Sequence, residues 1–388
     1  MITGSEFTKR LLGQFWPKVG FIFILLVGLL AVLSPYCAPD SSLYANAQHP
    51  ELCLAGPGTQ YIEYRLDATA NFQSLKSDAF QKKIMLHKYF IQDTLFKYSL
   101  LSSPETTIQC SLPKAVFGNN LFSYQYKTDN SGYQIVLKNK SQPVFFSMAQ
   151  LKKQLTSHQI LHRRFILGSD KLGRDYLSRL IWGARVSMSV GFIAVLVSLA
   201  MGLFMGSLAG YFGKRMDHAI SWLMNVIWSL PTILLIGAIS MLLGKGLFQI
   251  YLAIGLTMWV DTARLVRGQI LSIKQKEFVE AGTVLGYSKA RILMRHIWPN
   301  LWSSLLIYAA ANFSTAILTE AGLSFLGFGA QPPIPSWGEM ISAHKGYMLL
   351  DKAYLALIPG FAVTSLLLSF IVFSQGVRNA LNPRYKNA

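Results

Sequence analysis

The sequence predicts an all-α polytopic membrane protein with six transmembrane helices and a small α+β domain inserted between the first and second of them. Hydrophobic residues make up 52% of the 388-residue chain and charged residues only 14%, which is too apolar a balance for an ordinary soluble protein. Runs long enough, or nearly long enough, to cross a bilayer occur at residues 19–36, 186–211, 219–243, 247–266, 303–326 and 354–373. We expect three parts: residues 1–37 with the first helix, an inserted domain at 38–165, and a core at 166–388.

The distribution of basic residues predicts the orientation. Six spans place both chain ends on one side of the membrane, and the segments that would share this side are basic: the N-terminal segment, the connections after the second and fourth runs, and the C-terminal segment. By the positive-inside rule these segments lie in the cytoplasm, which places the inserted domain on the opposite face. The first run is expected to remain as an anchor, because Ser34-Pro35-Tyr36-Cys37 offers no A-x-A signal-peptide cleavage site.

Several function classes lack residues to support them. The formal net charge of +18 has no accompanying RNA-binding signature or basic groove interleaved with aromatic residues, so nucleic acid is not an expected partner. Anionic lipid of the inner leaflet accounts for cytoplasmic basic residues and makes membrane lipid the expected partner. The sequence has no phosphate loop, no nucleophile elbow and no His/Cys metal cluster, so we predict no ATP binding by this chain, no metal site and no enzyme activity.

The inserted domain carries signals for strands and for a helix. From Phe122 to Lys138, apolar and polar residues alternate on both sides of an Asn130-Ser131-Gly132 turn, which predicts a β-hairpin. The spacing of apolar residues at 79–97 predicts a helix. Cys53 and Cys110 could form a disulfide if the compartment is oxidising, leaving Cys37 over; the alternative is that all three are unpaired.

The segment before the second run predicts an amphipathic helix at the membrane interface. From Leu172 onward its apolar residues share one face, while its arginines can reach lipid headgroups. The polar and glycine residues of interest are Gly168, Asp170, Gly173, Arg174, Asp175, Arg179 and Arg185.

Small and polar residues form stripes along three of the predicted spans. Ser198, Gly202, Gly206 and Gly210 recur every four residues in the second span, which allows close helix packing either within the subunit or against a partner. In the third span we expect a kink at Pro231. Polar stripes at helical spacing either bond to neighbouring helices or line an aqueous path; the path candidates are Asn225, Ser229, Tyr308, Asn312, Thr315, Thr319 and Glu320. For Glu320 we expect a structural hydrogen bond rather than a proton-coupled role.

The polar segment 274–299, between the fourth and fifth runs, predicts two helices with a break between them. Good helix formers reach as far as Leu285, Gly286 suits the left-handed residue that closes a helix, and Ser288 is placed to cap the next helix before Pro299. A compact helical pair between membrane spans suits contact with another protein. The remaining residues that we single out here are Glu277, Glu280, Ala281 and Gly282.

Three motifs of this sequence resemble those of ABC importer permeases. The order E-A-A, three residues, G, nine residues, I-x-L-P is matched at Glu280, Ala281, Gly286 and Pro299, with Gly282, His296 and Trp298 as departures. The order G-S-D-x-x-G-R-D-x-x-S-R-x-x-x-G-A-R at residues 168–185 is similar to a segment of one permease subunit of dipeptide, oligopeptide and nickel importers. Residues 319–338, T-E-A-G-L-S-F-L-G-F-G-A-Q-P-P-I-P-S-W-G, resemble an outer loop of the same family.

The resemblance implies a permease in the bacterial inner membrane that moves peptides or a related small solute. It implies a heterodimer with a second permease subunit, two ATPase subunits that carry ATP and Mg²⁺ and dock on residues 274–299, and an extracytoplasmic solute-binding protein. The resemblance does not cover residues 38–165. Two other hypotheses are a membrane-anchored receptor or sensor whose outer domain is the working part, and a secondary transporter. A secondary transporter normally needs ionisable groups at mid-membrane, and Glu320, expected in the outer half of the bilayer, is its support here.

Overall fold

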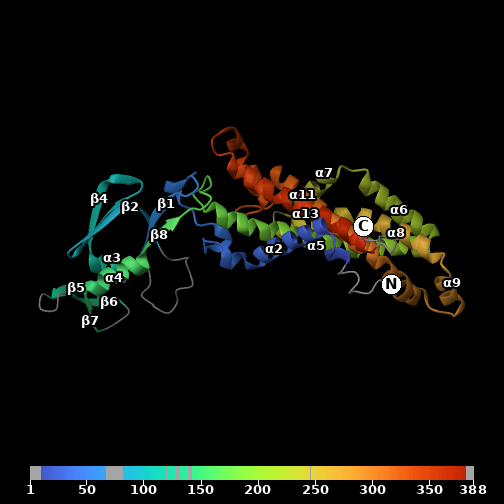
Figure 1. Cartoon of the computed structure of the whole chain (residues 1–388), viewed down its shortest axis with the longest axis horizontal. Coiled ribbons are helices and arrows are strands. Elements are labelled where there is room, and N and C mark those ends of the chain that lie inside the picture. The colour runs from blue at the N-terminus through green and yellow to red at the C-terminus, as the bar shows by residue number, and fades with distance from the viewer. Residues whose placement is uncertain are drawn as a thin grey trace. The chain divides into compact units, whose positions relative to one another are not determined.

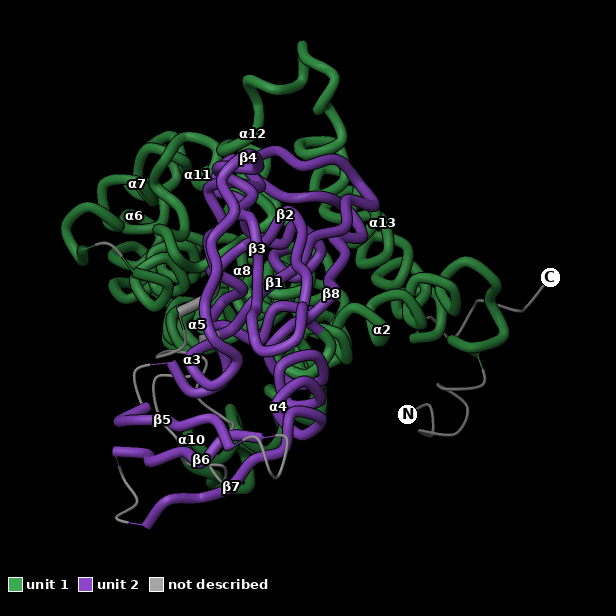
Figure 2. The backbone as a smooth tube through the Cα atoms, turned by 90° about the vertical axis from the view of Figure 1, so that its left-hand side faces the viewer, with its two compact units in different colours: residues 1–37, 180–388 green, residues 38–179 purple. Residues whose placement is uncertain are grey.

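The computed structural model describes residues 10–66, 82–118, 121–127, 132–138, 142–244 and 246–381. The chain divides into two compact units, Met1–Cys37 with Leu180–Ala388, and Ala38–Arg179 (Figure 2). The second unit includes residues 166–179, which were predicted to belong to the core at 166–388. Backbone hydrogen bonds join this segment to the unit: the Leu54 amide donates to the Asp170 carbonyl and the Ser169 amide to the Ala55 carbonyl.

The first unit is helical throughout its described part (Figure 1). Its elements are α2 (Phe15–Cys37), α5 (Tyr176–Ser207) with η7 (Leu208–Phe212), α6 (Lys214–Trp228), α7 (Thr232–Leu243), α8 (Leu247–Lys274), α9 (Glu277–Val284), α10 (Lys289–Ile292), η8 (Leu293–Ile297), α11 (Trp298–Phe325), α12 (Trp337–His344), η9 (Lys345–Leu349) and α13 (Tyr354–Leu381). Among the described residues, four helices are long and apolar enough to cross a membrane, or five if the bent pair α6–α7 forms one span.

The prediction of six spans requires that the bent pair α6–α7 forms one span and that α8 forms another. The predicted run at 247–266 lies within this helix, but the helix carries Asp261, Arg264 and Arg267 before it ends at Lys274. The predicted kink at Pro231 is confirmed, because α6 and α7 meet there at 94°. The ψ of Pro231 is 115°, well outside the helical range.

The small-residue stripe of α5 packs within the subunit, which decides between the two uses left open. The Ser198 and Thr262 hydroxyls lie 2.8 Å apart, so α5 and α8 are joined by a hydrogen bond. A Cβ added to Gly202 would collide with Thr262, and one added to Gly206 would lie 2.6 Å from the Ala263 carbonyl oxygen. Glycine is required there because the two helix backbones approach so closely.

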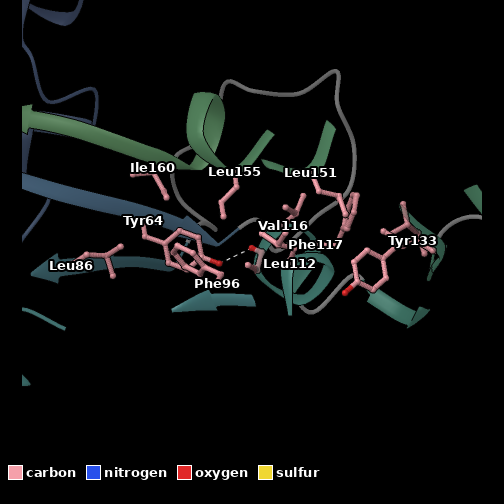
Figure 3. Packing of buried hydrophobic residues seen from close by; sticks show 13 residues of the cluster. Tyr64, Leu86, Phe96, Leu112, Val116, Phe117, Tyr133, Leu151, Leu155 and Ile160 are labelled. Carbon is pink, nitrogen blue, oxygen red and sulfur yellow. Dashed lines mark hydrogen bonds between the residues drawn. The ribbon is translucent and has the colours of Figure 1, made fainter. Parts of the chain in front are cut away.

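The second unit contains two antiparallel sheets. One has the order β4-β3-β2-β1-β8 and the other the order β5-β6-β7. The strands are β1 (Gln60–Leu66), β2 (Lys82–Gln92), β3 (Leu95–Leu100), β4 (Ser103–Ser111), β5 (Leu121–Lys127), β6 (Gly132–Leu137), β7 (Val144–Ser147) and β8 (Ile160–Arg164), with short helices α3 (Leu112–Phe117), α4 (Met148–Gln154) and η6 (Leu155–Gln159) among them. Their shared core includes Phe96, Leu112, Ile135 and Leu151, and the Tyr64 hydroxyl donates to the Ala115 carbonyl at 2.6 Å (Figure 3).

Two local predictions in this unit have different outcomes. The hairpin is confirmed, since β5 pairs with β6 in the register Tyr126 with Tyr133; residues 128–131 of its turn lie outside the described residues. The helix at 79–97 is wrong, because the described part of that segment forms β2 and the start of β3, joined at Asp93, whose φ is +47°. Cys37, Cys53 and Cys110 are all free, so the disulfide considered for Cys53 and Cys110 is not formed in the structure.

The first and last strands of the unit, β1 and β8, are paired with each other. Gln60 lies opposite Arg164, and just outside this pair the Phe165 amide donates to the Thr59 carbonyl at 2.9 Å. The two ends of segment 60–164 therefore lie side by side, as is typical of a domain inserted into a chain.

Candidate functional site

The segment after α8 folds as the two short helices that its sequence predicts. α9 ends in a left-handed glycine, Gly286, with φ of +74°. The Gly286 amide donates to the Thr283 carbonyl and the Tyr287 amide to the Gly282 carbonyl, both at 3.1 Å. This pair of bonds is the Schellman motif, and it fixes the direction in which the chain leaves α9.

The second helix of the segment continues into the long α11. The Ser288 hydroxyl accepts a hydrogen bond from the Arg291 amide at 3.3 Å and caps α10. From there helical structure runs without interruption over Lys289–Phe325, with Pro299 in the first turn of α11, where its missing N–H costs nothing. A displacement of α10 would therefore be carried directly into α11.

Buried apolar side chains attach the loop at residues 274–299 to α8 and α11. Val279, Ile292 and Ile297 are buried and form one cluster with Ile273 of α8 and Leu301 of α11. This close-packed cluster joins the loop to the ends of α8 and α11.

The two bulky residues that depart from the family motif add contacts of their own. The His296 ring stacks on Tyr287 with centroids 5.8 Å apart. The Trp298 indole nitrogen donates to the Ser207 hydroxyl of α5 at 3.0 Å. The stack lies within the loop, whereas the Trp298 bond joins the loop to α5.

The opposite side of α9 is exposed and partly apolar. Phe278, Ala281 and Leu285 recur at helical spacing on this side, with Val284 beside them and Glu277 and Glu280 on the same exposed helix. Val284 is 83% exposed and Leu285 69%. We call Phe278, Ala281, Val284 and Leu285 the α9 face. An exposed apolar patch bordered by charge is typical of a protein-interaction surface.

Sequence reasoning singled out the charged residues of α9 and missed three of the four residues of the α9 face. Phe278, Val284 and Leu285 were treated only as helix formers. The spacing of residues 278, 281 and 285 could have identified them, since it places them on one helix face.

Asn225, Ser229 and Asp217, in and just after α6, make hydrogen bonds within the subunit. Asn225 accepts a hydrogen bond from Arg264 at 2.9 Å, and the Ser229 hydroxyl donates to the Val226 carbonyl at 2.7 Å. Asp217 of α6 holds Arg267 of α8 in a bidentate pair, at 2.5 and 2.7 Å. The contacts of Asn225 and Asp217 attach α6 to α8.

The polar residues of α11 lie in different environments. Asn312 is buried, Thr315 is exposed, and the Thr319 hydroxyl donates to the Thr315 carbonyl at 2.7 Å. Glu320 is buried and accepts a hydrogen bond from the Ser324 hydroxyl at 2.7 Å. Tyr308 is partly buried.

Most of the motif at 168–185 is buried, and the prediction of an interfacial helix from Leu172 is wrong in two respects: α5 begins only at Tyr176, and Arg174 and Arg179 are buried. Asp170 accepts from the Arg174 guanidinium at 2.6 Å and lies 3.7 Å from that of Arg179; all three side chains are at most 3% exposed. Arg174 also donates to the Asn46 side chain at 3.0 Å. Arg174 and Arg179 can be buried because the Asp170 carboxylate pairs with them. Lipid headgroups were the partners expected from the sequence.

The other residues of this motif shape the same connection. Gly168 and Gly173 have φ of +81° and +72°, and Asp175 accepts hydrogen bonds from the amide and the hydroxyl of Ser178. Burial raises the pKa of the Asp175 carboxyl, and the bonds from Ser178 oppose the shift. Arg185 alone among the motif's three arginines is exposed, 5.4 Å from the Trp182 ring.

These features define a class of protein: a helical membrane protein with several long apolar helices and an exposed helical loop between two of its long helices. The family model described as "Binding-protein-dependent transport system inner membrane component" matches residues 202–387. The chain belongs to this family, and it is a permease subunit of an ABC importer, not an enzyme.

Three relatives illustrate the similarity. The dipeptide transport system permease protein DppC of Alkalihalophilus pseudofirmus is 38% identical over 220 residues, which are 57% of this chain and 72% of the relative. The glutathione transport system permease protein GsiD of Pectobacterium atrosepticum is 37% identical over 57% of this chain and 73% of its own length. The oligopeptide transport system permease protein OppC of Bacillus subtilis is 37% identical over 56% and 72%.

Proposed function

We propose that this permease translocates peptides, or a related small solute, delivered by a solute-binding protein. The names of the relatives, which carry dipeptides, oligopeptides and glutathione, support this substrate class. The protein would work with a second permease subunit as a heterodimer and with two ATPase subunits. With α8 as the fourth of six spans, both termini and α9 lie in the cytoplasm and residues 38–165 outside the inner membrane.

The observation that carries the proposal is the exposed α9 face on a loop fixed to two long helices. Apolar side chains in water are costly to leave uncovered, and an ATPase cleft that receives α9 would cover them. ATP and Mg²⁺ would bind to the partner subunits, and this chain would need no cofactor. Among the described residues, no group of three or more His, Cys, Asp or Glu side chains could hold a metal ion.

The geometry suggests how the ATPase drives the permease. Closure of the ATPase dimer around ATP would displace α9. Because Val279 and Ile292 pack in one cluster with α8 and α11, both helices would follow. The two permeases would then rock between inward-open and outward-open states, a motion that nucleotide can drive only by binding the two states with different affinities.

For the translocation path we propose the residues on α11. Thr315, Thr319 and Tyr308 are exposed or partly buried in the subunit by itself. Asn225 is a weaker candidate because its side chain is already hydrogen-bonded to Arg264 of α8. Glu320 is a structural residue in this proposal, bonded to Ser324.

Purification in mild detergent from cells that express the whole system tests the proposal. We expect two ATPase subunits and a second permease to be recovered with this chain, and the reconstituted complex to take up dipeptides at the expense of ATP. The alternative is a membrane-anchored sensor that works through residues 38–165. Recovery of the chain without ATPase subunits, under conditions that preserve a known importer, would support the sensor and contradict the importer.

A further inference from the structure

The edge strand β5 of the three-stranded sheet differs from the other three sheet edges of the second unit. β4 contains Pro104 and Glu105, β8 ends in two arginines, and β7 has only four residues. Prolines, charges and short length are the devices by which proteins keep an edge strand from pairing with another chain. β5 has seven residues, Leu-Phe-Ser-Tyr-Gln-Tyr-Lys, with no proline and no charge before Lys127.

The apolar face of this sheet is buried at β6 and extends onto β5, where it is exposed. Across the β5–β6 ladder, Tyr124 lies opposite Ile135 and Tyr126 opposite Tyr133. Residues opposite each other in an antiparallel pair point to the same face. Ile135 is buried in the core of the unit, as is Tyr133 (Figure 3). Tyr124 and Tyr126 therefore point to the core side, yet they are 44% and 45% exposed.

The two tyrosines are ordered by their neighbours and form a platform. Both rings meet the Tyr133 ring edge-on, with centroids 5.8 and 5.2 Å away, and the Tyr124 hydroxyl accepts from the Ser111 hydroxyl at 3.0 Å. Ser123 and Gln125 point to the opposite face of the sheet. A further strand beside β5 would cover the two tyrosine rings and would pair with the outward N–H and C=O groups of the edge.

We propose that β5 binds an extended peptide, which adds to the sheet as a fourth strand next to β5 and covers Tyr124 and Tyr126. Main-chain pairing recognises peptides of many sequences, as a peptide importer requires, and in this choice of occupant the inference rests on the proposed function. Basic residues outnumber acidic ones in residues 38–179, and Lys127 ends the strand, so peptides with carboxylate side chains are favoured.

The test uses the purified full chain in detergent and the hexapeptide Glu-Val-Glu-Val-Glu-Val, titrated by calorimetry. The valines of such a peptide would contact Tyr124 and Tyr126, while its glutamates would lie on the opposite face of the sheet, with Gln125. The same hexapeptide N-methylated at every residue keeps the side chains but loses the donors for strand pairing. We expect the unmodified peptide to bind and the methylated one to bind at least about tenfold more weakly, which is ~1.4 kcal/mol.

A pair of variants locates the binding. Tyr124→Lys places a charge on the tyrosine side of the edge and should weaken binding by a similar factor, whereas Gln125→Lys, on the opposite face of the same strand, should leave it unchanged. Equal binding of both hexapeptides, or no binding of either, would overturn the inference. So would a dimer of the chain that Tyr124→Lys dissociates without any peptide binding, because β5 would then pair with a second copy.

The outcome is separable from that of the proposed function. A chain that co-purifies with ATPase subunits but does not bind the hexapeptide overturns the β5 inference and leaves the importer. A chain that binds the hexapeptide through β5 and recovers no ATPase supports the inference and contradicts the importer.

Discussion

The indole nitrogen of Trp298 donates to the Ser207 hydroxyl at 3.0 Å, and this bond joins the loop between α8 and α11 to α5. Ser207 is only 2% exposed, so its hydroxyl has little access to water as a substitute partner. The bond lies where the loop enters α11, and it is made by a residue that replaces the leucine of the family motif. The loop is therefore attached to three long helices rather than to the two that its chain connects.

Replacing Trp298 by Phe should weaken this attachment while it keeps an aromatic ring. The loss of one hydrogen bond to a buried hydroxyl is expected to cost about 1 kcal/mol in the free energy of local opening. Hydrogen exchange of the α9 and α10 amides, followed by mass spectrometry, would measure it. Trp302→Phe is the control, because Trp302 lies one turn further along α11 and is exposed. Equal exchange in both variants would show that the bond does not hold the loop.

Replacing Gly286 by Val should uncouple ATP hydrolysis from transport. The φ of +74° is costly for any residue with a Cβ, by ~1–2 kcal/mol, and more for a β-branched side chain. The space around Gly286 is open, so the strain lies in the backbone, and we expect the chain to insert normally with α10 misdirected.

Gly346→Val is the matched control for this variant, because Gly346 is also in open space but has no positive φ. The measurement is uptake per ATP hydrolysed in proteoliposomes. Normal uptake by Gly286→Val would contradict the role given to the turn.

Much of the fold follows from short-range signals. Pro231 and the glycine of the α9 turn each act within a few residues, so their sequence context was enough, whereas the use of the α5 glycines depends on α8. Lys82–Gln92 was misassigned because its apolar residues satisfy helical spacing as well as strand alternation. The arginines of the 168–185 motif could not be placed from sequence, because their burial depends on Asp170 and on Asn46, more than a hundred residues away. The exposed side of α9 needed the structure to show which of its apolar residues are left uncovered.

Replacing Asp170 by Asn should destabilise the second unit strongly. The carboxylate is fully buried against the Arg174 and Arg179 guanidinium groups, and removing one partner of such a pair typically costs about 3–5 kcal/mol. Thermal unfolding and limited proteolysis of residues 38–179 would detect the loss. Arg185→Gln, at the exposed arginine of the same motif, should have little effect. An Asp170→Asn chain as resistant as the Arg185→Gln control would refute the structural role.

The free thiols predict the pattern of alkylation. In non-reduced protein both Cys53 and Cys110 should react with iodoacetamide, since neither is in a disulfide. Burial raises the pKa of the Cys110 thiol, against a smaller opposing effect of Lys114. Less of this thiol is therefore in the reactive thiolate form at a given pH, so its labelling should be slow near neutrality and should increase as the pH rises. Detection of a Cys53–Cys110 peptide by mass spectrometry would contradict this.

The central claim is that the α9 face receives the ATPase, and a charge placed on it tests this most directly. Val284→Asp puts a carboxylate on a side chain that is 83% exposed, and Leu349→Asp does the same at a residue that is 96% exposed and lies outside the loop. Neither change removes a buried side chain, so both proteins should fold. The measurement is the amount of ATPase subunit recovered per permease in mild detergent. We predict a loss of about tenfold or more for Val284→Asp, ~1.4 kcal/mol of binding free energy, and full recovery for Leu349→Asp; equal recovery in both would contradict the claim.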